Sequence, residues 1–479
     1  MLDVELDLMG AQPALFKLYT QLAFVYPMPD SSSKSHVVSV LNEGLKRLSE
    51  SFPWVAGQVV HTSSDSDGPL KYRIRPLDSI PKLVEKDYTY EPTVPTFEEL
   101  EDAGFPMSMM SEDVWAPCPT LSGLTYGTSG SASSNDKTAP VMLAQLSFIK
   151  GAVVLCINMQ HNVCDMMGQS AVMSLLTKAC RGEAFSEHDI VLGQKDRTQV
   201  VPLIEAGQWN PVDVLGDQLI SLQRRSEDES ATARSPALDV KAAELREIQK
   251  PQVLGTYFSF RATSLKALKS LATETLPSDR EFISMDDAIS ALIFQSVLRA
   301  RGPRINNEKR SVTFARAVDA RRYLGVDPQY PGVLQNMTYT KYHPSDLLNA
   351  PLGHIAAAMR EQIDSSSSDV ALRTRALVTF LSQSPENATN VSFTASLKTD
   401  TDIMLSSWAK VPAYDWDFGF GLGAPVAVRR PAFVPVESLM YIMPKDGRGD
   451  VSVWMCLRND DIERLNEDSE WTRFATHLG

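Results

Sequence analysis

The chain of 479 residues is 43% hydrophobic and 22% charged, a composition typical of folded globular proteins with about two or three domains. Its formal net charge of −13 disfavours non-specific binding to nucleic acid or to an anionic membrane surface. The five scattered cysteines form no CxxC pair, and neither a basic, apolar leader nor a long apolar run is present. We therefore expect a cytoplasmic protein with reduced thiols, without a transmembrane helix.

In chain order, the N-terminal part predicts a mixture of helices and strands. The stretch "SKSHVVSVLNEGLKRLSESFP" (33–53) keeps its apolar residues at helical spacing and ends at a proline. Two predicted strands follow, "PWVAGQVV" (53–60) and "LKYRIRPL" (70–77). The small polar residues of 125–140 predict a surface loop.

The next segment predicts a hairpin and a helix. The runs "LAQLSFI" (143–149) and "AVVLCINMQ" (152–160) predict antiparallel strands, and the second runs directly into His161. A helix is predicted over 168–181, with Gly182 as its stop.

Apolar patterning weakens from 186 to 251, where many charges predict a long surface crossover between two halves. The second half predicts a strand at 255–260, a helix at 284–302 and a strand at 311–318. Ser284 is the predicted N-cap of that helix, and Gly302 its end. The final third predicts short strands alternating with turns. The mixture without regular βα alternation predicts α+β layers.

One stretch, "INMQHNVCDMMGQ" (157–169), places a histidine where a strand end presents side chains at the rim of a sheet. A histidine suits proton transfer near neutral pH, so His161 is a candidate catalytic base, and a buried structural histidine is the alternative. A metal site is not expected, because no third ligand lies near His161 and Asp165. Covalent catalysis by Cys164 would require a base of its own.

A second stretch, "SSWAKVPAYDWDFGFGLGAP" (406–425), is rich in glycine. A DFG tripeptide without a Gly-rich loop and HRD motif upstream does not indicate a kinase. The GFGLGA run matches a dinucleotide fingerprint, but Pro425 stands where the phosphate-binding helix would begin. A glycine-rich turn between closely passing backbone segments is the remaining interpretation.

Taken together, HxxxD at His161–Asp165 and DFGFG at Asp417–Gly421 resemble the paired motifs of the BAHD superfamily of acyl-CoA-dependent acyltransferases. "VDAR" (318–321) and "SMDDAISALIF" (284–294) resemble two further elements of that family. Stretches from end to end, such as "GLKRLSESFPWVAGQV" and "YPGVLQNMTY", are similar to fungal trichothecene 3-O-acetyltransferases. Two departures stand out: Met166-Met167 precede Gly168, and Phe420 replaces the usual tryptophan of the second motif.

The resemblance implies an α+β protein of two similar chloramphenicol-acetyltransferase-like domains, with a solvent channel and the acyl-CoA site at their interface. The expected ranges are 1–195 for the first domain, 196–250 for a crossover linker and 251–479 for the second domain. The implied substrates are acetyl-CoA and an alcohol, most closely the 3-hydroxyl of a trichothecene-like sesquiterpenoid. A monomer without metal, nucleic-acid or membrane partners is expected.

The same resemblance assigns roles to single residues. His161 would act as general base in direct transfer, while Asp165 would pair with Arg321 to hold the histidine loop. Ser406 and the indole N–H of Trp408 would stabilise the oxyanion, although Trp408 as a simple core residue is an equal alternative. The remaining candidates are structural residues of the second motif, Asp417, Gly419 and Gly421, and residues expected near CoA, Ser284, Asp286 and Ser407.

Three alternatives stay open. One is an acyltransferase of the same superfamily that acts on a different secondary-metabolite alcohol or amine. Another is a condensation-type domain, although such domains carry a double histidine and here Gln160 precedes His161. The last is a binding protein without catalysis, against which the intact HxxxD motif argues.

Overall fold

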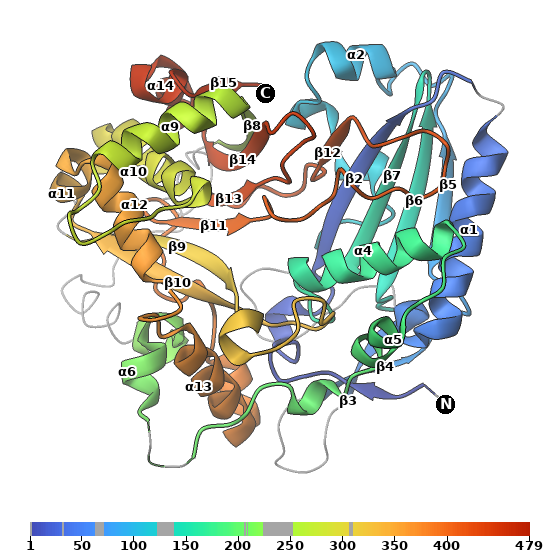
Figure 1. Ribbon diagram of the computed structural model, residues 1–479, viewed down its shortest axis with the longest axis horizontal. Helices are drawn as coiled ribbons and strands as arrows, with labels where there is room; N and C mark the ends of the chain where they lie inside the picture. Colours follow the sequence, from blue (N-terminus) through green and yellow to red (C-terminus); the bar gives the residue numbers. More distant parts are fainter. Residues whose placement is uncertain are drawn as a thin grey trace, which may run out of the picture.

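The computed structural model describes residues 2–30, 33–62, 71–121, 138–205, 207, 209–223, 252–305 and 310–479. Within them, helices and strands form two halves that lie side by side, each built on a mixed sheet (Figure 1). The strands are β1 Val4–Glu5, β2 Tyr19–Pro27, β3 Gly57–Thr62, β4 Lys71–Pro76, β5 Lys82–Asp87, β6 Met142–Ile149, β7 Ala152–Gln160, β8 Val253–Phe260, β9 Val312–Asp319, β10 Gln335–Tyr342, β11 Ile403–Ser407, β12 Ala427–Arg429, β13 Leu439–Ile442, β14 Val451–Arg458 and β15 Ala475–His477. The α-helices are α1 Lys34–Ser51, α2 Phe97–Asp102, α3 Glu112–Trp115, α4 Met166–Cys180, α5 Glu187–Gly193, α6 Pro211–Leu215, α9 Ala262–Glu274, α10 Met285–Ile305, α11 Pro344–Asn349, α12 Leu352–Glu361, α13 Val370–Gln383, α14 Asn459–Glu467 and α15 Ser469–Thr472.

The N-terminal sheet has the strand order β12-β2-β7-β6-β5. Its centre is the predicted hairpin of β6 and β7, which pair antiparallel around Gly151 with a positive φ of 88°. Every residue of both strands is buried, because α1 and α4 pack on one face (Figure 1). A hydrophobic cluster that includes Trp115 covers the other face. Burial on both faces explains why these strands are continuous apolar runs rather than alternating ones.

The C-terminal sheet has seven strands in the order β10-β9-β11-β13-β14-β8-β15. Its outer face packs against α10, which in turn contacts α9, α12 and α14 (Figure 1). Ser284 caps α10 as predicted: its hydroxyl accepts the Asp287 N–H at 3.2 Å, and its own N–H donates to the Asp287 carboxylate at 2.8 Å.

The two halves share strands and core. β12 belongs to the C-terminal third of the chain, yet it pairs antiparallel with β2 and forms the edge of the N-terminal sheet. One core cluster includes Leu155 and Val172 of the N-terminal half together with Tyr257 and Trp454 of the C-terminal half. The two halves therefore share part of one hydrophobic core.

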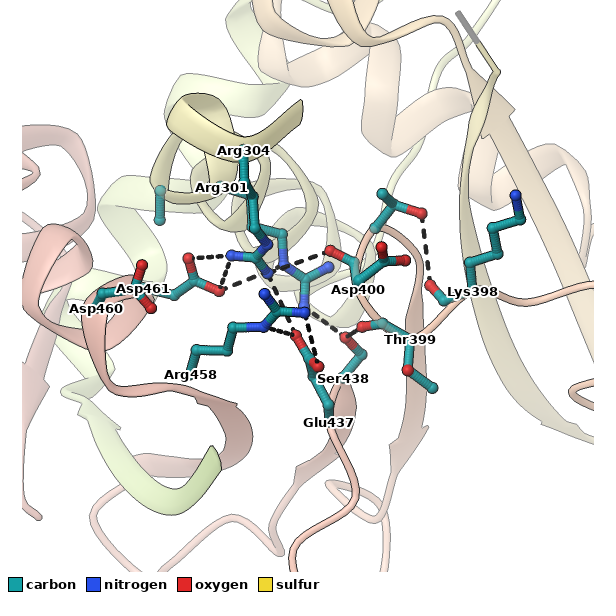
Figure 2. A network of polar contacts seen from close by, with 12 residues as sticks. Arg301, Arg304, Lys398, Thr399, Asp400, Glu437, Ser438, Arg458, Asp460 and Asp461 are labelled. Atoms are coloured by element: carbon teal, nitrogen blue, oxygen red, sulfur yellow. Dashed lines mark hydrogen bonds and ion pairs between the residues drawn. The ribbon is translucent and has the colours of Figure 1, made fainter. Parts of the chain in front are cut away.

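An arginine network fixes α10 to the C-terminal sheet (Figure 2). Arg301 is fully buried and donates to the Ser438 hydroxyl at 2.5 Å and to the Asp402 carbonyl at 3.2 Å. Arg304 binds the buried Asp461 carboxylate of α14 at 2.5 Å. These contacts position β13, the neighbour of β11, relative to α10.

Several element predictions need correction. The first four residues of the predicted strand 53–60 form a 3-10 helix, Pro53–Ala56, because the proline favours a helical first turn. α10 continues past Gly302 to Ile305, and the final third contains α12, α13 and α14 as well as strands. Residues 125–137 of the predicted loop and residues 206, 208 and 224–250 of the predicted linker lie outside the described residues.

Candidate active site

His161 sits immediately after β7, where pairing with β2 has brought Gln160 opposite Tyr19. Its backbone N–H donates to the Leu18 carbonyl at 2.7 Å, so the strand partner fixes the point at which the chain turns away. The side chain is partly exposed, while Nδ1 is buried and has no hydrogen-bond partner among the described residues. The imidazole is therefore held at the sheet rim without a carboxylate bound to it.

The surroundings of His161 favour its neutral form. Burial lowers the pKa of His161 below its ordinary 6.5, and the positive charge of Arg430 acts in the same direction. The carboxylate of Asp165 opposes this change. A neutral imidazole at neutral pH is the form that can accept a proton.

Asp165 is saturated by contacts that point away from the histidine. Arg321 donates to both of its oxygens at 3.0 Å, and both side chains are buried. The N–H of Gly168 donates to Oδ1 at 2.7 Å, and the N–H of Leu334 to Oδ2 at 2.6 Å. Asp165 thus caps α4 and joins the histidine loop to the C-terminal half.

The loop at 330–334 packs tightly onto the start of α4. A Cβ added at Gly168 would lie 2.4 Å from the Pro331 carbonyl oxygen, so only glycine fits there. Arg321 reaches the same loop and donates to the Gly332 carbonyl at 2.7 Å. The glycine that follows Met166-Met167 therefore permits the close approach.

Ser406 and Trp408 stand at the end of β11, next to β13. The Trp408 indole N–H donates to the Ser406 hydroxyl at 3.1 Å, and the ring is buried against Tyr441 at a centroid separation of 4.5 Å. The Trp408 donor is thus engaged by Ser406, whereas the Ser406 hydroxyl accepts this bond and keeps its own O–H to donate. Ser407 is partly exposed, and its hydroxyl accepts the Ala409 N–H at 3.5 Å.

The DFGFG turn lies at the other end of α4 from His161. Arg181, just after α4, donates to the Asp417 carbonyl at 2.6 Å, and the Gly419 N–H donates to the Asp417 carboxylate at 2.8 Å. Gly419 and Gly421 both have φ of 72°. Because α4 has 15 residues, about 22 Å of helix separates this turn from the histidine loop.

Phe420, which departs from the family tryptophan, is buried and stacks on Phe418 at 5.6 Å. Its ring also meets Tyr26 of β2 edge to face at 5.7 Å. A phenylalanine therefore fills an aromatic packing position.

Ser284 and Asp286 lie at the start of α10. The Ser284 hydroxyl serves the helix cap, as it donates to the Asp287 carboxylate at 2.8 Å. Asp287 is itself buried between Arg316 and Arg360. The Oδ1 of Asp286 is buried without a partner among the described residues, so it is an open acceptor.

Sequence reasoning missed two buried arginines that influence the motif, one by direct contact and one through its charge. Arg197 is buried and donates to the Val163 carbonyl at 2.6 Å, inside the HxxxD loop. Arg430 is buried after β12, and its charge acts on His161. The available signal in the sequence was the doublet Arg429-Arg430 directly after the apolar run "PVAV" (425–428), since arginine is rarely buried without a partner.

Other chemistries find less support in the structure. Cys164 is fully buried, and burial raises its pKa to about 12, so its thiolate is scarce at neutral pH. Within the described ranges, no group of three or more histidine, cysteine or acidic side chains could hold a metal ion. No helix of the described part of the chain is long and apolar enough to cross a bilayer.

Comparison with known proteins places this geometry in context. The model of the trichothecene 3-O-acetyltransferase-like N-terminal domain matches residues 18–180, and that of the transferase family matches residues 113–472. Trichothecene 3-O-acetyltransferase TRI101 of Fusarium sporotrichioides is 42% identical over 477 residues, which cover 100% of this chain and 97% of the relative. O-acetyltransferase dmxR13 of Cryptosporiopsis sp. is 41% identical over 479 residues, which cover 100% of this chain and 98% of the relative. The crystal structure of F. sporotrichioides TRI101 complexed with coenzyme A and T-2 matches with a TM-score of 0.87 at 41% identity and covers 100% of both chains.

Proposed function

The chain belongs to the transferase family and shares its BAHD-type two-domain fold, and on this basis we propose that it moves an acetyl group from acetyl-CoA to a hydroxyl of a trichothecene-like sesquiterpenoid, at position 3. The observation that carries the proposal is full-length similarity to a trichothecene 3-O-acetyltransferase. The HxxxD motif is also complete, with His161 directly after β7. The proposed substrate class rests on the name of that relative and on the match to the trichothecene 3-O-acetyltransferase-like N-terminal domain.

His161 is the proposed general base. An alcohol has a pKa far above neutral, so its attack on a thioester needs a base within hydrogen-bond reach of the hydroxyl. The lowered pKa of His161 supports this role, since it keeps the imidazole neutral. His161 would take the hydroxyl proton as the new ester bond forms, and return it to the departing CoA thiolate. No covalent acyl-enzyme is needed.

Asp165, Arg321 and the second motif would hold the site in place. The saturated contacts of Asp165 support a positioning role rather than proton transfer. The distance of Asp417, Gly419 and Gly421 from the histidine loop supports a structural role for them.

CoA would lie along the C-terminal half. The unpartnered Oδ1 of Asp286 suits an N–H donor of CoA, such as an amide or the adenine amine. Ser407 would contribute a hydroxyl from the partly exposed end of β11. Ser284 would act through the α10 cap, because its hydroxyl is engaged there.

A cytoplasmic location is part of the proposal. All five cysteines are free in the structure, as expected where thiols are kept reduced. Cell fractionation with an antibody against the chain would test this location.

A second candidate function is acetylation of another fungal alcohol or of an amine. Its support is the 41% identity to dmxR13, named only as an O-acetyltransferase. Related folds exchange acceptors through changes in pocket side chains.

The test is a thiol-release assay with acetyl-CoA and a trichothecene that bears a free 3-hydroxyl. We expect turnover by the wild type and a loss of about 10²–10⁴-fold in His161→Ala, as for removal of a general base. His36→Ala is the matched control, because His36 is exposed on α1. Release with other alcohols but no trichothecene would favour the second candidate, and a folded, fully active His161→Ala would exclude the base.

A further inference from the structure

The loop of the HxxxD motif is fixed at both of its ends. At its start, the His161 N–H donates to the Leu18 carbonyl at 2.7 Å. At its end, the Asp165 carboxylate is bound by Arg321 at 3.0 Å. Between these points, both amide atoms of the Asn162 side chain are buried and have no hydrogen-bond partner among the described residues. The middle of the loop is therefore held through its backbone.

Arg197 contacts the loop at its central residue, Val163. The Val163 N–H donates to the Gln160 carbonyl at 3.0 Å, within the turn itself. The Val163 carbonyl accepts Nη1 of Arg197 at 2.6 Å, and Arg197 comes from the 3-10 helix Arg197–Gln199 in the predicted linker. In the described part of the chain, no other side chain forms a hydrogen bond to residues 162–164. Arg197 is thus the side-chain anchor for the middle of the loop.

The guanidinium of Arg197 is itself held by packing on Trp54. Arg197 is only 4% exposed, and its guanidinium carbon lies 4.7 Å from the Trp54 ring centre. The Trp54 indole N–H donates to the Gly193 carbonyl at 2.8 Å, which fixes the ring. A planar guanidinium on an aromatic face has a defined position and direction. The Val163 carbonyl therefore meets a donor that is already in place.

Stability alone explains the charge at Arg197 poorly. Its Nη2 is buried and has no partner among the residues that the structure describes. Burial raises the pKa of Asp7 to about 6, and the Arg197 charge opposes that rise, but no hydrogen bond joins the two side chains. A buried charge is costly unless it is paired, and apolar replacements of buried ionic groups are often neutral or stabilising. The contact with the loop is therefore the better explanation of the arginine.

We propose that Arg197 is a positioning residue of the transfer reaction, which keeps His161 at the acceptor hydroxyl by holding the Val163 carbonyl. The inference rests on the proposed function, in which His161 is the base. A loop that is free in its middle lets the imidazole move, and a displacement of about 1 Å can reduce the rate by about 10²-fold. Asp165 and Arg321 fix the end of the loop and cannot replace this contact.

The experiment replaces Arg197 by Met, which is apolar and donates no hydrogen bond, and by Lys. In Arg197→Met we expect kcat for thiol release to fall by about 10–10²-fold, while KM for acetyl-CoA and the melting temperature change little. In Arg197→Lys the ammonium ends one bond short of the Nη1 position and cannot stack in a plane on Trp54. We expect that variant to lose about threefold to tenfold in kcat.

Arg429→Met is the matched control. Arg429 is 7% exposed, and its guanidinium carbon lies 5.1 Å from the Tyr257 ring centre. Its three guanidinium nitrogens donate at 3.1 Å each to carbonyls outside the HxxxD loop, those of Phe105, Val428 and Gly104. Because these buried carbonyls lose their donors, the control should have a lower melting temperature, with unchanged kcat of the folded enzyme.

The pH profile separates positioning from stability. Burial lowers the pKa of His161, and the charges of Asp165 and Arg430 also act on it. A loosened loop admits water to the imidazole, so its pKa rises toward 6.5. The acid limb of kcat/KM should therefore move to higher pH in Arg197→Met and stay in place in Arg429→Met.

Several results would overturn the inference. Wild-type kcat in folded Arg197→Met would do so. A lower kcat with an unmoved acid limb, and a melting temperature lowered as in Arg429→Met, would indicate packing alone and would also overturn it. If Arg197→Met does not fold, wild-type kcat in Arg197→Lys would contradict the role. A wild type that acetylates no acceptor would overturn the proposed function, whereas an active wild type with fully active Arg197 variants would overturn this inference alone.

Discussion

At the scale of single residues, the two polar members of the HxxxD motif have different environments. His161 keeps an unbound Nδ1 and a lowered pKa, whereas Asp165 accepts four hydrogen bonds. A carboxylate occupied in this way cannot also orient the imidazole. The arrangement therefore differs from a Ser-His-Asp triad, in which the acid binds Nδ1–H.

The pKa of His161 predicts the pH dependence of the reaction. Only the neutral imidazole accepts a proton, so the rate falls when pH drops through the pKa of the free enzyme. Because burial lowers that pKa, the acid limb of kcat/KM should lie below pH 6.5. The measurement is kcat/KM with acetyl-CoA from about pH 5 to pH 9. A limb at or above 6.5 would contradict the assignment.

Removal of the Asp165 carboxylate should destabilise the fold. Asp165→Ala leaves the Arg321 charge buried with a single carboxylate partner, Asp319, and should cost about 3–5 kcal/mol in the free energy of unfolding. Asp319→Ala is the control: its side chain is 34% exposed, so the cost should be at most about 1 kcal/mol. Denaturant unfolding of both variants gives the comparison, and equal midpoints would contradict the structural role.

At the scale of elements, α4 connects the two motifs. Its N-terminus is capped by Asp165 and packs on the 330–334 loop, and Arg181 after its C-terminus binds the DFGFG turn. α4 is therefore anchored to the histidine loop at one end and to the second motif at the other, and it fixes how far apart they lie. Its docking depends on the absence of a side chain at Gly168.

Gly168→Ala should disturb this docking. The new Cβ would lie 2.4 Å from the Pro331 carbonyl oxygen, a backbone atom that cannot rotate away, and should cost about 1–3 kcal/mol together with a lower kcat. Gly216→Ala is the control, since its Cβ would meet nothing within 4 Å and its backbone is helical. Thermal unfolding and thiol release measure both effects. A wild-type melting temperature and wild-type thiol release in Gly168→Ala would show that the 330–334 loop moves aside without cost, and would contradict this prediction.

At the scale of the whole molecule, hydrogen bonds join the C-terminal sheet to the edge of the N-terminal sheet. The Tyr257 hydroxyl of β8 accepts the Arg430 N–H at 2.9 Å and donates to the Arg430 carbonyl at 3.1 Å. One buried side chain of the C-terminal sheet therefore fixes the backbone that follows β12 of the N-terminal sheet.

Tyr257→Phe should destabilise the contact between the two halves. It leaves a buried N–H and a buried carbonyl of Arg430 without partners, at a cost of about 1–3 kcal/mol in the free energy of unfolding. Tyr339→Phe is the control, since it removes one hydroxyl bond, to the Phe393 carbonyl, within the C-terminal half. We expect the control to lose less stability in thermal unfolding. An equal loss in both variants would contradict the importance of the Tyr257 contact.

Much of this protein could be predicted from the sequence. The hairpin before His161 and the cap at Ser284 follow from local patterning, whereas the two-domain fold was implied by the family resemblance, and the comparisons confirm the fold. The ion pair of Asp165 with Arg321, implied by the resemblance, is present in the structure. Local propensity and the order of motifs are properties of the sequence, so they can be recognised without knowledge of the tertiary structure.

Other features were decided only by the tertiary structure. The edge position of β12, the engagement of Trp408 by Ser406 and the burial of Arg430 among aromatic rings each depend on which distant segments meet. The helices of the final third were missed, since their burial comes from packing against α10 and β10 rather than from strong local signals. Whether a polar group finds a partner is a property of the assembled interior, and single-sequence patterns do not encode it.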